Sequence, residues 1–359
     1  MGANSFGRYL TMTTFGESHG PALGLVLDGL PPGLALDLAA LQLELDRRRP
    51  GQSRVTSARR EADLAEILSG LYDGRTTGAP LAMIFRNEDQ DSSAYLEQAE
   101  LFRPGHADYA FEAKYGLRDP RGGGRSSGRE TVARVAAGAV ARQILGPHGV
   151  KVLGWVDRVA DVSARDFDPA AIFENPVRCP DGRAAALMQE AIEAARASED
   201  SVGGIVRVRA EGVPAGLGDP IFCKLDGMIG LAMLSIGGVR AVEIGDGWAM
   251  AAMKGSEAND ALGPKGYLSN HSGGLNGGVS NGAPIEVTLA VKPTSSIGLP
   301  QETIDLRGAP RTIRVKGRHD PCLCPRVVPV AEAMLAFCLA DALLAQRALG
   351  REPSPKGMP

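Results

Sequence analysis

The sequence lacks the cysteine pattern of a zinc site or a disulfide framework. Its five cysteines are an odd number scattered along 359 residues, and no two of them form a CxxC pair. We therefore predict reduced thiols in a cytoplasmic protein. Residues 1–20 have no apolar core of a secretory signal, and we find no apolar run of about 18 residues that would span a membrane.

The chain also lacks a large excess of charge of either sign. Its formal net charge is −3, whereas a general nucleic-acid binder needs a basic surface. The histidines are far apart and show no HExxH or similar spacing. We therefore predict neither a nucleic-acid partner nor a metal site.

Glycine is the residue present in excess, at 46 of 359 positions, well above the usual ~7%. The glycines are not periodic but cluster in short loops, where the backbone can approach a ligand closely. An ordinary tight turn is the alternative for any single loop. Because several of these loops also carry Arg, Ser or His, we favour a binding site. The clusters are residues 122–124, 237–238, 273–274 and 277–278.

Apolar periodicity predicts helices and strands interspersed along the chain, which indicates a mixed α and β fold. A hydrophobic content of 44% suffices for a buried core. The expected helices are residues 37–49, 131–145, 183–198 and 330–349, and the expected strands are residues 22–27, 204–208 and 285–291.

Two segments, residues 24–33 and 204–216, share a pattern of strand, turn and following apolar segment. The pattern indicates two similar halves packed together, with coincidence as the alternative. No linker rich in Ser or Pro divides the chain, so we expect one compact domain over residues 1–350. Residues 351–359 are expected to form a disordered tail.

The segment 121–131 (RGGGRSSGRET) is predicted to bind an anion at the start of a helix. Ser127 and Glu130 have the spacing of a capping box. A helix N-terminus presents free N–H groups and a partial positive charge, to which Arg125 and Arg129 would add bidentate contacts. An ordinary capped helix with solvated arginines is the alternative. The segment matches neither a Rossmann fingerprint nor a P-loop.

Four other polar loops carry residues suited to acid–base chemistry or anion binding. His19 and His106 lie in two of them, where an imidazole can act as a general acid near neutral pH. A histidine bonded to the backbone of a turn is the alternative. The loops at residues 292–296 (KPTSS) and 316–322 (KGRHDPC) combine cations with hydroxyl, His and Asp side chains. Together, the loops predict a small ligand that carries phosphate, carboxylate or both.

These segments, in this order, resemble the chorismate synthase family. The resemblance runs from about residue 4 to residue 346, almost the whole chain, and five ordered blocks are far more specific than any one of them. The blocks are residues 16–20 (GESHG), 124–131 (GRSSGRET), 270–274 (NHSGG), 292–296 (KPTSS) and 318–322 (RHDPC).

The resemblance implies an α+β fold of antiparallel sheets layered around helices, with pseudo-twofold halves and a homotetrameric assembly. It implies a shikimate-pathway lyase that removes phosphate from 5-enolpyruvylshikimate 3-phosphate by anti-1,4 elimination and so yields chorismate. Reduced FMN is required without net redox change and comes from a separate source, since no further domain is expected. The family is associated with NADP as well. Neither a nucleic acid nor a membrane is an implied partner.

By the same resemblance, His19 protonates the departing phosphate, His106 protonates the reduced flavin or stays close to it, and Asp320 assists proton removal. The residues expected to bind substrate are Ser18, Arg48, Arg54, Arg103 and Arg129. The residues expected to bind FMN are Arg125, Ser126, Ser127, Gly237, Gly238, Gly277, Lys292, Pro293, Thr294, Ser295, Ser296 and Arg318.

Two other functions are alternatives at this point. A phosphosugar transferase would need a carboxylate pair for Mg²⁺ or a P-loop, and the sequence has neither. A non-catalytic protein that binds an anionic metabolite would not need two loop histidines or the block at residues 316–322.

Overall fold

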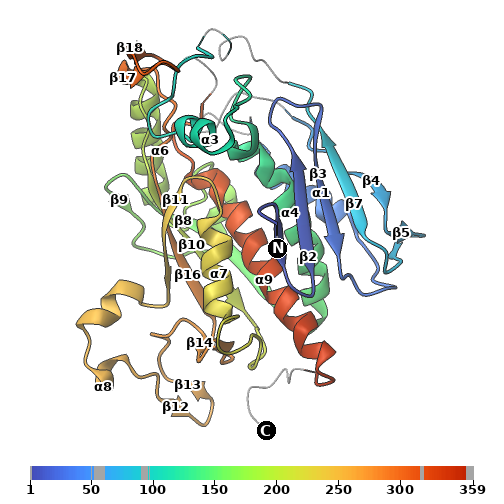
Figure 1. Ribbon diagram of the computed structural model, residues 1–359. Helices are drawn as coiled ribbons and strands as arrows, with labels where there is room; N and C mark the ends of the chain where they lie inside the picture. The colour runs from blue at the N-terminus through green and yellow to red at the C-terminus, as the bar shows by residue number, and fades with distance from the viewer. Residues whose placement is uncertain are drawn as a thin grey trace.

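Two five-stranded antiparallel sheets enclose a layer of helices (Figure 1). The computed structural model describes residues 2–49, 51, 61–89, 96, 98–315 and 319–352. The first sheet has the strand order β1-β2-β3-β7-β4, and the second has the order β11-β16-β10-β8-β9. In Figure 1 the first sheet lies on the right, with α4 and α9 between it and the second sheet. The predicted α+β sandwich is therefore confirmed.

The strands of the first sheet are β1 (Ser5–Gly7), β2 (Thr11–Gly16), β3 (Ala22–Asp28), β4 (Glu66–Ser69) and β7 (Leu81–Arg86). The strands of the second sheet are β8 (Lys151–Val159), β9 (Val162–Ser163), β10 (Gly204–Glu211), β11 (Val239–Ile244) and β16 (Ile285–Val291). Short hairpins pair β5 (Leu71–Tyr72) with β6 (Arg75–Thr76), β12 (Leu262–Gly263) with β13 (Gly266–Tyr267), β14 (Leu275–Asn276) with β15 (Val279–Ser280), and β17 (Gln301–Ile304) with β18 (Pro310–Ile313).

The α-helices are α1 (Leu38–Arg48), α3 (Asp108–Tyr115), α4 (Thr131–Leu145), α5 (Ala171–Glu174), α6 (Gly182–Ala197), α7 (Leu225–Leu234), α8 (Gly255–Ala258) and α9 (Cys324–Ala348). The 3₁₀ turns are η1 (Gly124–Ser126), η2 (Gly128–Glu130), η3 (Gly146–His148) and η4 (Gly247–Ala252).

The same succession of elements occurs twice along the chain. The elements β2, β3, α1, β4, β7 and α4 follow one another in the first half, and β8, β10, α7, β11, β16 and α9 follow one another in the second. Their order across the sheets is also the same, β2-β3-β7-β4 in one and β8-β10-β16-β11 in the other. The two segments that share a sequence pattern are the equivalent β3–α1 and β10–α7 connections. The expected pseudo-twofold halves are therefore confirmed.

Helix α9 forms the centre of the core and differs most from its sequence prediction. It begins at Cys324 rather than at residue 330. Pro325 lies in the first turn, where no N–H is needed, and burial of the whole helix outweighs the hydrogen bond that Pro329 removes.

The helix also has the length and the mean hydropathy, 2.0, of a membrane span, so the expectation that no segment would be apolar enough was wrong. Of its 18 most apolar consecutive residues, 89% are buried inside the protein, between the two sheets.

The two central helices, α4 and α9, cross at a glycine. A Cβ atom built on Gly138 of α4 would lie 2.3 Å from Cβ and 2.4 Å from Cα of Ala333 in α9. Real Cβ atoms do not approach backbone atoms this closely, so any larger residue forces the helices apart. The glycine lowers helix propensity, but it allows the two halves of the fold to pack in direct contact.

Replacement of Gly138 by alanine is expected to destabilise the protein by about 1–3 kcal/mol, because the added methyl group overpacks this crossing. Urea unfolding followed by circular dichroism measures the change. The matched control is Gly230→Ala in α7, where an added Cβ meets nothing within 4 Å. That control should be neutral or slightly stabilising, as alanine is the better helix former. Equal midpoints for the two variants would contradict the prediction.

Candidate active site

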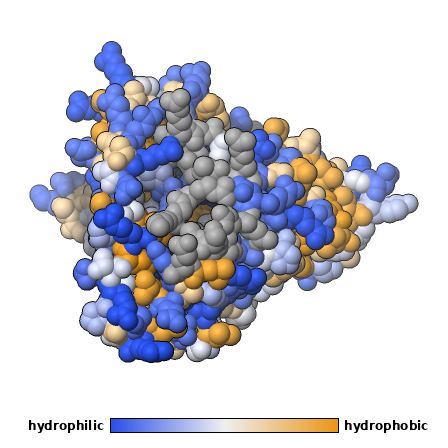
Figure 2. All heavy atoms as spheres, turned by 90° about the horizontal axis from the view of Figure 1, so that it is seen from above, coloured by the Kyte–Doolittle hydropathy of each residue, from blue (hydrophilic) through white to orange (hydrophobic). Residues whose placement is uncertain are grey.

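A cavity of about 620 Å³ opens where helices α4 and α9 begin. Figure 2, which looks onto the upper end of Figure 1, shows hydrophilic residues over much of this face. The described residues that line the cavity are His19, Asp89, Arg103, Gly105, His106, Ala107, Phe111, Gly123, Arg125, Ser126, Ser127, Gly128, Arg129, Glu130, Thr131, Arg134, Ser235, Ile236, Gly237, Gly238, Lys292, Thr294, Ser295, Ser296, His319, Asp320, Leu323, Arg326, Val327 and Val330.

The duplication of the fold gives this cavity its positive potential. Helices α4 and α9 are equivalent in the two halves, and the first turns of both contribute to the cavity wall. The free N–H groups of a first turn carry a partial positive charge. Six cationic side chains that line the cavity add to it, namely Arg103, Arg125, Arg129, Arg134, Lys292 and Arg326. The site therefore suits a small polyanion.

His19 follows β2, and two neighbours approach its ring closely. Its Nδ1 lies 2.9 Å from Oγ of Ser18, which is fully buried. A Cβ atom built on Gly122 would lie 2.2 Å from Nδ1 and 2.5 Å from Cε1 of the ring. Ser18 thus contacts the ring rather than the cavity. Because residue 122 has no side chain, the backbone can pass directly against the His19 ring.

Replacement of Gly122 by alanine is expected to displace the His19 ring. Since the sequence predicts that His19 is a general acid, a shift of about 1 Å would lower kcat by about 10–100-fold. Turnover and the melting temperature are measured together. Gly146→Ala, where a Cβ would meet nothing within 4 Å, is the matched control and should retain full activity. Wild-type kcat in Gly122→Ala would show that the position of His19 does not matter.

His106 lies in the loop before α3, within a cluster of charged groups. Its Nδ1 is 2.8 Å from Oδ1 of Asp108 and 3.1 Å from Nη2 of Arg103. Arg103 in turn forms a bidentate ion pair with Asp108, with distances of 2.7 and 2.8 Å. Burial alone would raise the pKa of Asp108, but hydrogen bonds from Arg103 and His106 hold it well below its usual value.

Two arginines predicted to bind substrate share one buried carboxylate. Arg48 Nη2 lies 2.5 Å from Oδ2 of Asp63, and Arg129 pairs with the other oxygen of the same group. Burial, together with the positive charges of Arg326 and Arg129, lowers the pKa of Arg48 to about 10, although Asp63 opposes the shift. Arg129 lines the cavity, whereas Arg48 lies behind it and donates to Oγ1 of Thr131 at 3.2 Å.

The glycine-rich segment is organised differently from the predicted capping box. Ser127 accepts a hydrogen bond from the N–H of Arg129 and caps the 3₁₀ turn η2. Glu130 points along the helix instead and pairs with Arg134 at 2.9 Å. The 3₁₀ turn η2 lies between Ser127 and the first α-helical residue, Thr131. Ser127 and Glu130 therefore cannot cap one α-helix reciprocally. Arg125 donates to Oγ1 of Thr14 at 2.6 Å and so attaches the segment to β2.

The loop after β16 connects the cavity wall to the His106 loop. Lys292 Nζ donates to the carbonyl oxygen of Gly105 at 2.6 Å. Burial, with a smaller contribution from Arg240, lowers the pKa of Lys292. Thr294 Oγ1 donates to the carbonyl oxygen of Asp320 at 2.7 Å. The loop therefore holds the second block of predicted FMN residues beside Asp320.

Asp320 lies just before α9, and its carboxylate is only 7% exposed. Its Oδ2 is 2.5 Å from Nη1 of Arg326, one turn into the helix. The Nε atom of Arg326 is buried and has no hydrogen-bond partner among the described residues. The guanidinium therefore has a donor available for an anionic ligand.

The structure brings most of the predicted site residues into this one cavity. Of those in the described part of the chain, the residues that do not line it are Ser18, Arg48, Gly277 and Pro293. Gly277 lies in the β14–β15 hairpin, beside the first residue of α7. The cavity is at the opposite end of this helix. Arg54 and Arg318 lie outside the residues that the structure describes.

Sequence reasoning missed Arg134, Arg326 and Asp108. Arg134 is one helical turn after Glu130, and this i,i+4 pair was a readable signal. Arg326 was missed because the helix was expected to begin after it. Asp108 lies two residues after His106, a spacing that matches no acid–base motif.

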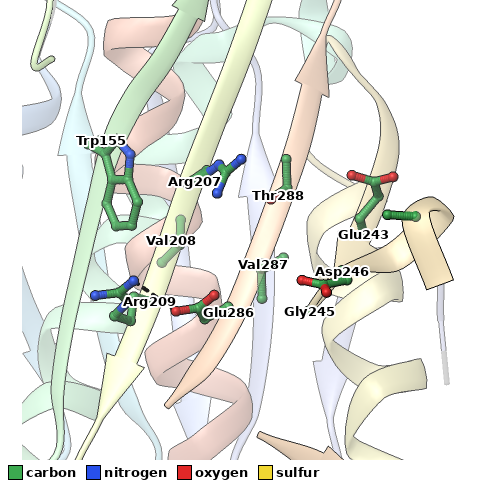
Figure 3. Close-up of a pocket in the computed structure, with 11 residues that line it drawn as sticks. Trp155, Arg207, Val208, Arg209, Glu243, Gly245, Asp246, Glu286, Val287 and Thr288 are labelled. Carbon is green, nitrogen blue, oxygen red and sulfur yellow. Dashed lines mark ion pairs between the residues drawn. The ribbon is translucent and has the colours of Figure 1, made fainter. Parts of the chain in front are cut away.

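Two other kinds of site can be compared with this cavity among the described residues. Among the described residues, no group of three or more His, Cys, Asp or Glu side chains is arranged to hold a metal ion. A smaller hollow of about 320 Å³ lies on the face of the second sheet that carries Trp155 and Arg207 (Figure 3). None of the predicted site residues that the structure describes lines it, and two of its charged residues, Arg209 and Glu286, pair with each other at 2.8 Å. We therefore do not consider it the functional site.

The geometry defines a protein with a cavity for a small polyanion, in which three histidines and Asp320 lie among cations. A family model described as chorismate synthase matches residues 10–344. The chain belongs to the chorismate synthase family, a family of shikimate-pathway lyases.

Individual relatives support this assignment. The chain is 56% identical over 352 residues to the chorismate synthase of Chloroflexus aurantiacus, with 97% of each chain covered. It is 53% identical to that of Roseiflexus castenholzii, with 97% of this chain and 98% of the relative covered. A crystal structure of chorismate synthase, 33% identical in sequence, superposes with a TM-score of 0.76 over 95% of this chain and 93% of the other.

Proposed function

We propose that this chain catalyses the anti-1,4 elimination of phosphate from 5-enolpyruvylshikimate 3-phosphate to give chorismate, with reduced FMN and no net redox change. The observation that carries the proposal is the gathering of His19, His106 and Asp320 in one cationic cavity formed by both halves of the fold. A substrate with one phosphate and two carboxylates needs many cations, and guanidinium groups bind such anions in a fixed orientation. A phosphosugar transferase would need a carboxylate pair for Mg²⁺ or a P-loop, which the sequence lacks, and a simple binding protein would not need the acid–base groups.

The residues present fit a phosphorylated flavin beside this substrate. The volume of about 620 Å³ lies within the roughly 300–1,000 Å³ of small-molecule sites. Arg125 and Lys292 supply cations, and the buried Nε of Arg326 supplies an unused donor. The remaining proposed FMN contacts on this wall are Ser126, Ser127, Gly237, Gly238, Thr294, Ser295 and Ser296. When bound, reduced FMN supplies electron density that eases cleavage of the C–O bond.

In this proposal the chain holds the substrate and moves two protons. Arg129, Arg134 and the first turns of α4 and α9 hold the phosphate and carboxylates. His19 donates a proton to the departing phosphate and so neutralises charge that develops in the transition state. Asp320, whose side chain is fixed by Arg326, assists removal of the proton from the ring. A third group, His106, protonates the reduced flavin or stays close to it.

The test is turnover under anaerobic conditions with reduced FMN, with oxidised FMN, or with no flavin. We expect phosphate release and chorismate absorbance only with reduced FMN. Phosphate release without flavin would indicate a phosphatase and contradict the proposal. Flavin and substrate binding without turnover would favour a protein that only binds anionic metabolites.

Substrate and FMN together are expected to raise the melting temperature well above the effect of either alone. Each bound anion relieves repulsion among the cations that line the cavity. Ligand at 100 times its Kd stabilises the folded state by about 2.7 kcal/mol per site. Differential scanning fluorimetry measures the shift, with sulfate at equal ionic strength as the control. A melting temperature unchanged by both ligands would contradict this part of the account.

The proposed setting is a homotetramer in the cytoplasm that receives reduced FMN from a separate source. All five cysteines are unpaired, which supports a reducing compartment. Large apolar side chains are exposed on and beside the first sheet, including Phe15, Leu64 and Leu68. Figure 2 shows hydrophobic residues gathered on the right, the side on which Figure 1 draws this sheet. Exposed apolar patches are typical of surfaces that another protein chain covers, which supports the proposed oligomer.

A further inference from the structure

The loop that carries His106 contains a buried carboxylate that the proposed mechanism does not use. The side chain of Asp108 is only 3% exposed. Arg103 donates to both of its oxygens, at 2.7 and 2.8 Å, and Arg118 Nη1 lies 3.5 Å from Oδ2. Two guanidinium groups therefore compensate the one buried negative charge and keep the carboxylate ionised.

The same carboxylate determines which nitrogen of His106 carries a proton. His106 Nδ1 lies 2.8 Å from Oδ1 of Asp108. An ionised carboxylate only accepts hydrogen bonds, so an unprotonated Nδ1 at this distance would repel it. The contact is therefore a hydrogen bond in which Nδ1–H donates to Asp108. The 3.1 Å contact between Nδ1 and Nη2 of Arg103 then joins two donors that both point at the carboxylate.

We infer that Asp108 is the positioning residue of His106, because it fixes a proton on Nδ1 and leaves Nε2 as the nitrogen available to the cavity. The role in turnover rests on the proposed function, whereas the tautomer does not. Proton exchange with a bound ligand then proceeds through Nε2 alone. Without the carboxylate, the imidazole would change tautomer or rotate, and the alignment of Nε2 would be lost.

The inference also changes the role of Arg103. The sequence predicted that Arg103 binds substrate, yet its Nε and Nη2 atoms both donate to Asp108, and Nη2 also approaches the carbonyl oxygen of Gly122 at 3.5 Å. Arg103 is thereby the anchor of the carboxylate that positions His106. Its main contacts are inside the protein, although part of the side chain lines the cavity.

The tautomer can be measured directly in the intact protein. The chain has only five histidines, so ¹⁵N-histidine labelling gives a simple two-bond ¹H–¹⁵N spectrum. The His106 signals are identified by their loss in His106→Gln. We expect the neutral ring to carry its proton on Nδ1 in the wild-type protein, and a mixed or reversed tautomer in Asp108→Asn. A wild-type His106 that carries its single proton on Nε2 would overturn the inference, even if no variant folded.

Kinetics test the consequence for turnover. In Asp108→Asn we expect kcat to fall by about 10²–10⁴-fold, the range for loss of acid–base function, while KM stays nearly unchanged. Glu112→Gln, on the same helix and 4.0 Å from Arg118, is the matched control and should keep wild-type kcat. Wild-type kcat in Asp108→Asn would overturn the inference. If the wild-type chain itself shows no turnover, the proposed function fails, and the spectrum still decides the tautomer.

Discussion

Replacing His19 with alanine is expected to lower kcat by about 10²–10⁴-fold, the usual contribution of a general acid. The phosphate would then have to leave without a proton, which places the developing charge on the cationic wall alone. The variant should still fold and bind FMN, because the ring lies at the cavity wall, beside Oγ of Ser18 and the backbone of Gly122. The measurement is single-turnover phosphate release with saturating reduced FMN.

Two further histidine variants make this result specific. His148→Ala is the matched control, because His148 lies at the far end of α4, in a contact of 3.0 Å with Arg347, and should not affect turnover. His106→Ala should also lower kcat, but should change the spectrum of the bound reduced flavin more than His19→Ala does. Identical flavin spectra in the two variants would contradict the separate roles proposed for these histidines.

The second large effect is on stability, at Glu332 in the middle of α9. Its side chain is fully buried, 2.8 Å from Nη1 of Arg47 and 3.1 Å from Nη2 of Arg142. It also accepts a hydrogen bond of 2.7 Å from the N–H of Gly154. These partners belong to α1, α4 and β8, so one carboxylate connects the two halves of the fold.

Glu332→Ala is expected to destabilise the protein by about 3–5 kcal/mol, because Arg47 and Arg142 lose their fully buried partner and the N–H of Gly154 loses its acceptor. The matched control is Glu44→Ala. Glu44 contacts the same two arginines but is 23% exposed, so water replaces it and the expected cost is about 0–1 kcal/mol. Urea midpoints compare the two variants. Equal losses would show that the buried carboxylate does not hold the halves together.

The regular elements were readable from local patterns because their periodicity is strong. The helix predicted over residues 131–145 and the strand predicted over residues 285–291 have the bounds of α4 and β16. The start of α9 was not readable, since two prolines argue against a helix and only the burial of its first turns overrides them. Gly138 also looked like a weak point in a helix. Only the structure shows that Gly138 is needed, because Ala333 of α9 packs directly against it.

The sequence predicted the separate motifs of the site, but not that they would meet in one cavity. Five blocks far apart in sequence carried the right residue types, yet no pattern in the sequence says that the first turns of α4 and α9 meet. The structural duplication explains this meeting, because equivalent helices bring equivalent ends to one place. Asp108 and Arg326 act through neighbours in space, and such partners leave no periodic signal. The block at residues 270–274 and Gly277 lie apart from the cavity in this chain.

The most direct test of the account is the stoichiometry of one anaerobic reaction. Purified protein, 5-enolpyruvylshikimate 3-phosphate and reduced FMN are mixed without oxygen, and phosphate, chorismate and the flavin spectrum are recorded together. The account predicts equal amounts of phosphate and chorismate, while the flavin is as reduced at the end as at the start. Product formation matched by flavin oxidation, or phosphate without chorismate, would contradict an elimination with no net redox change.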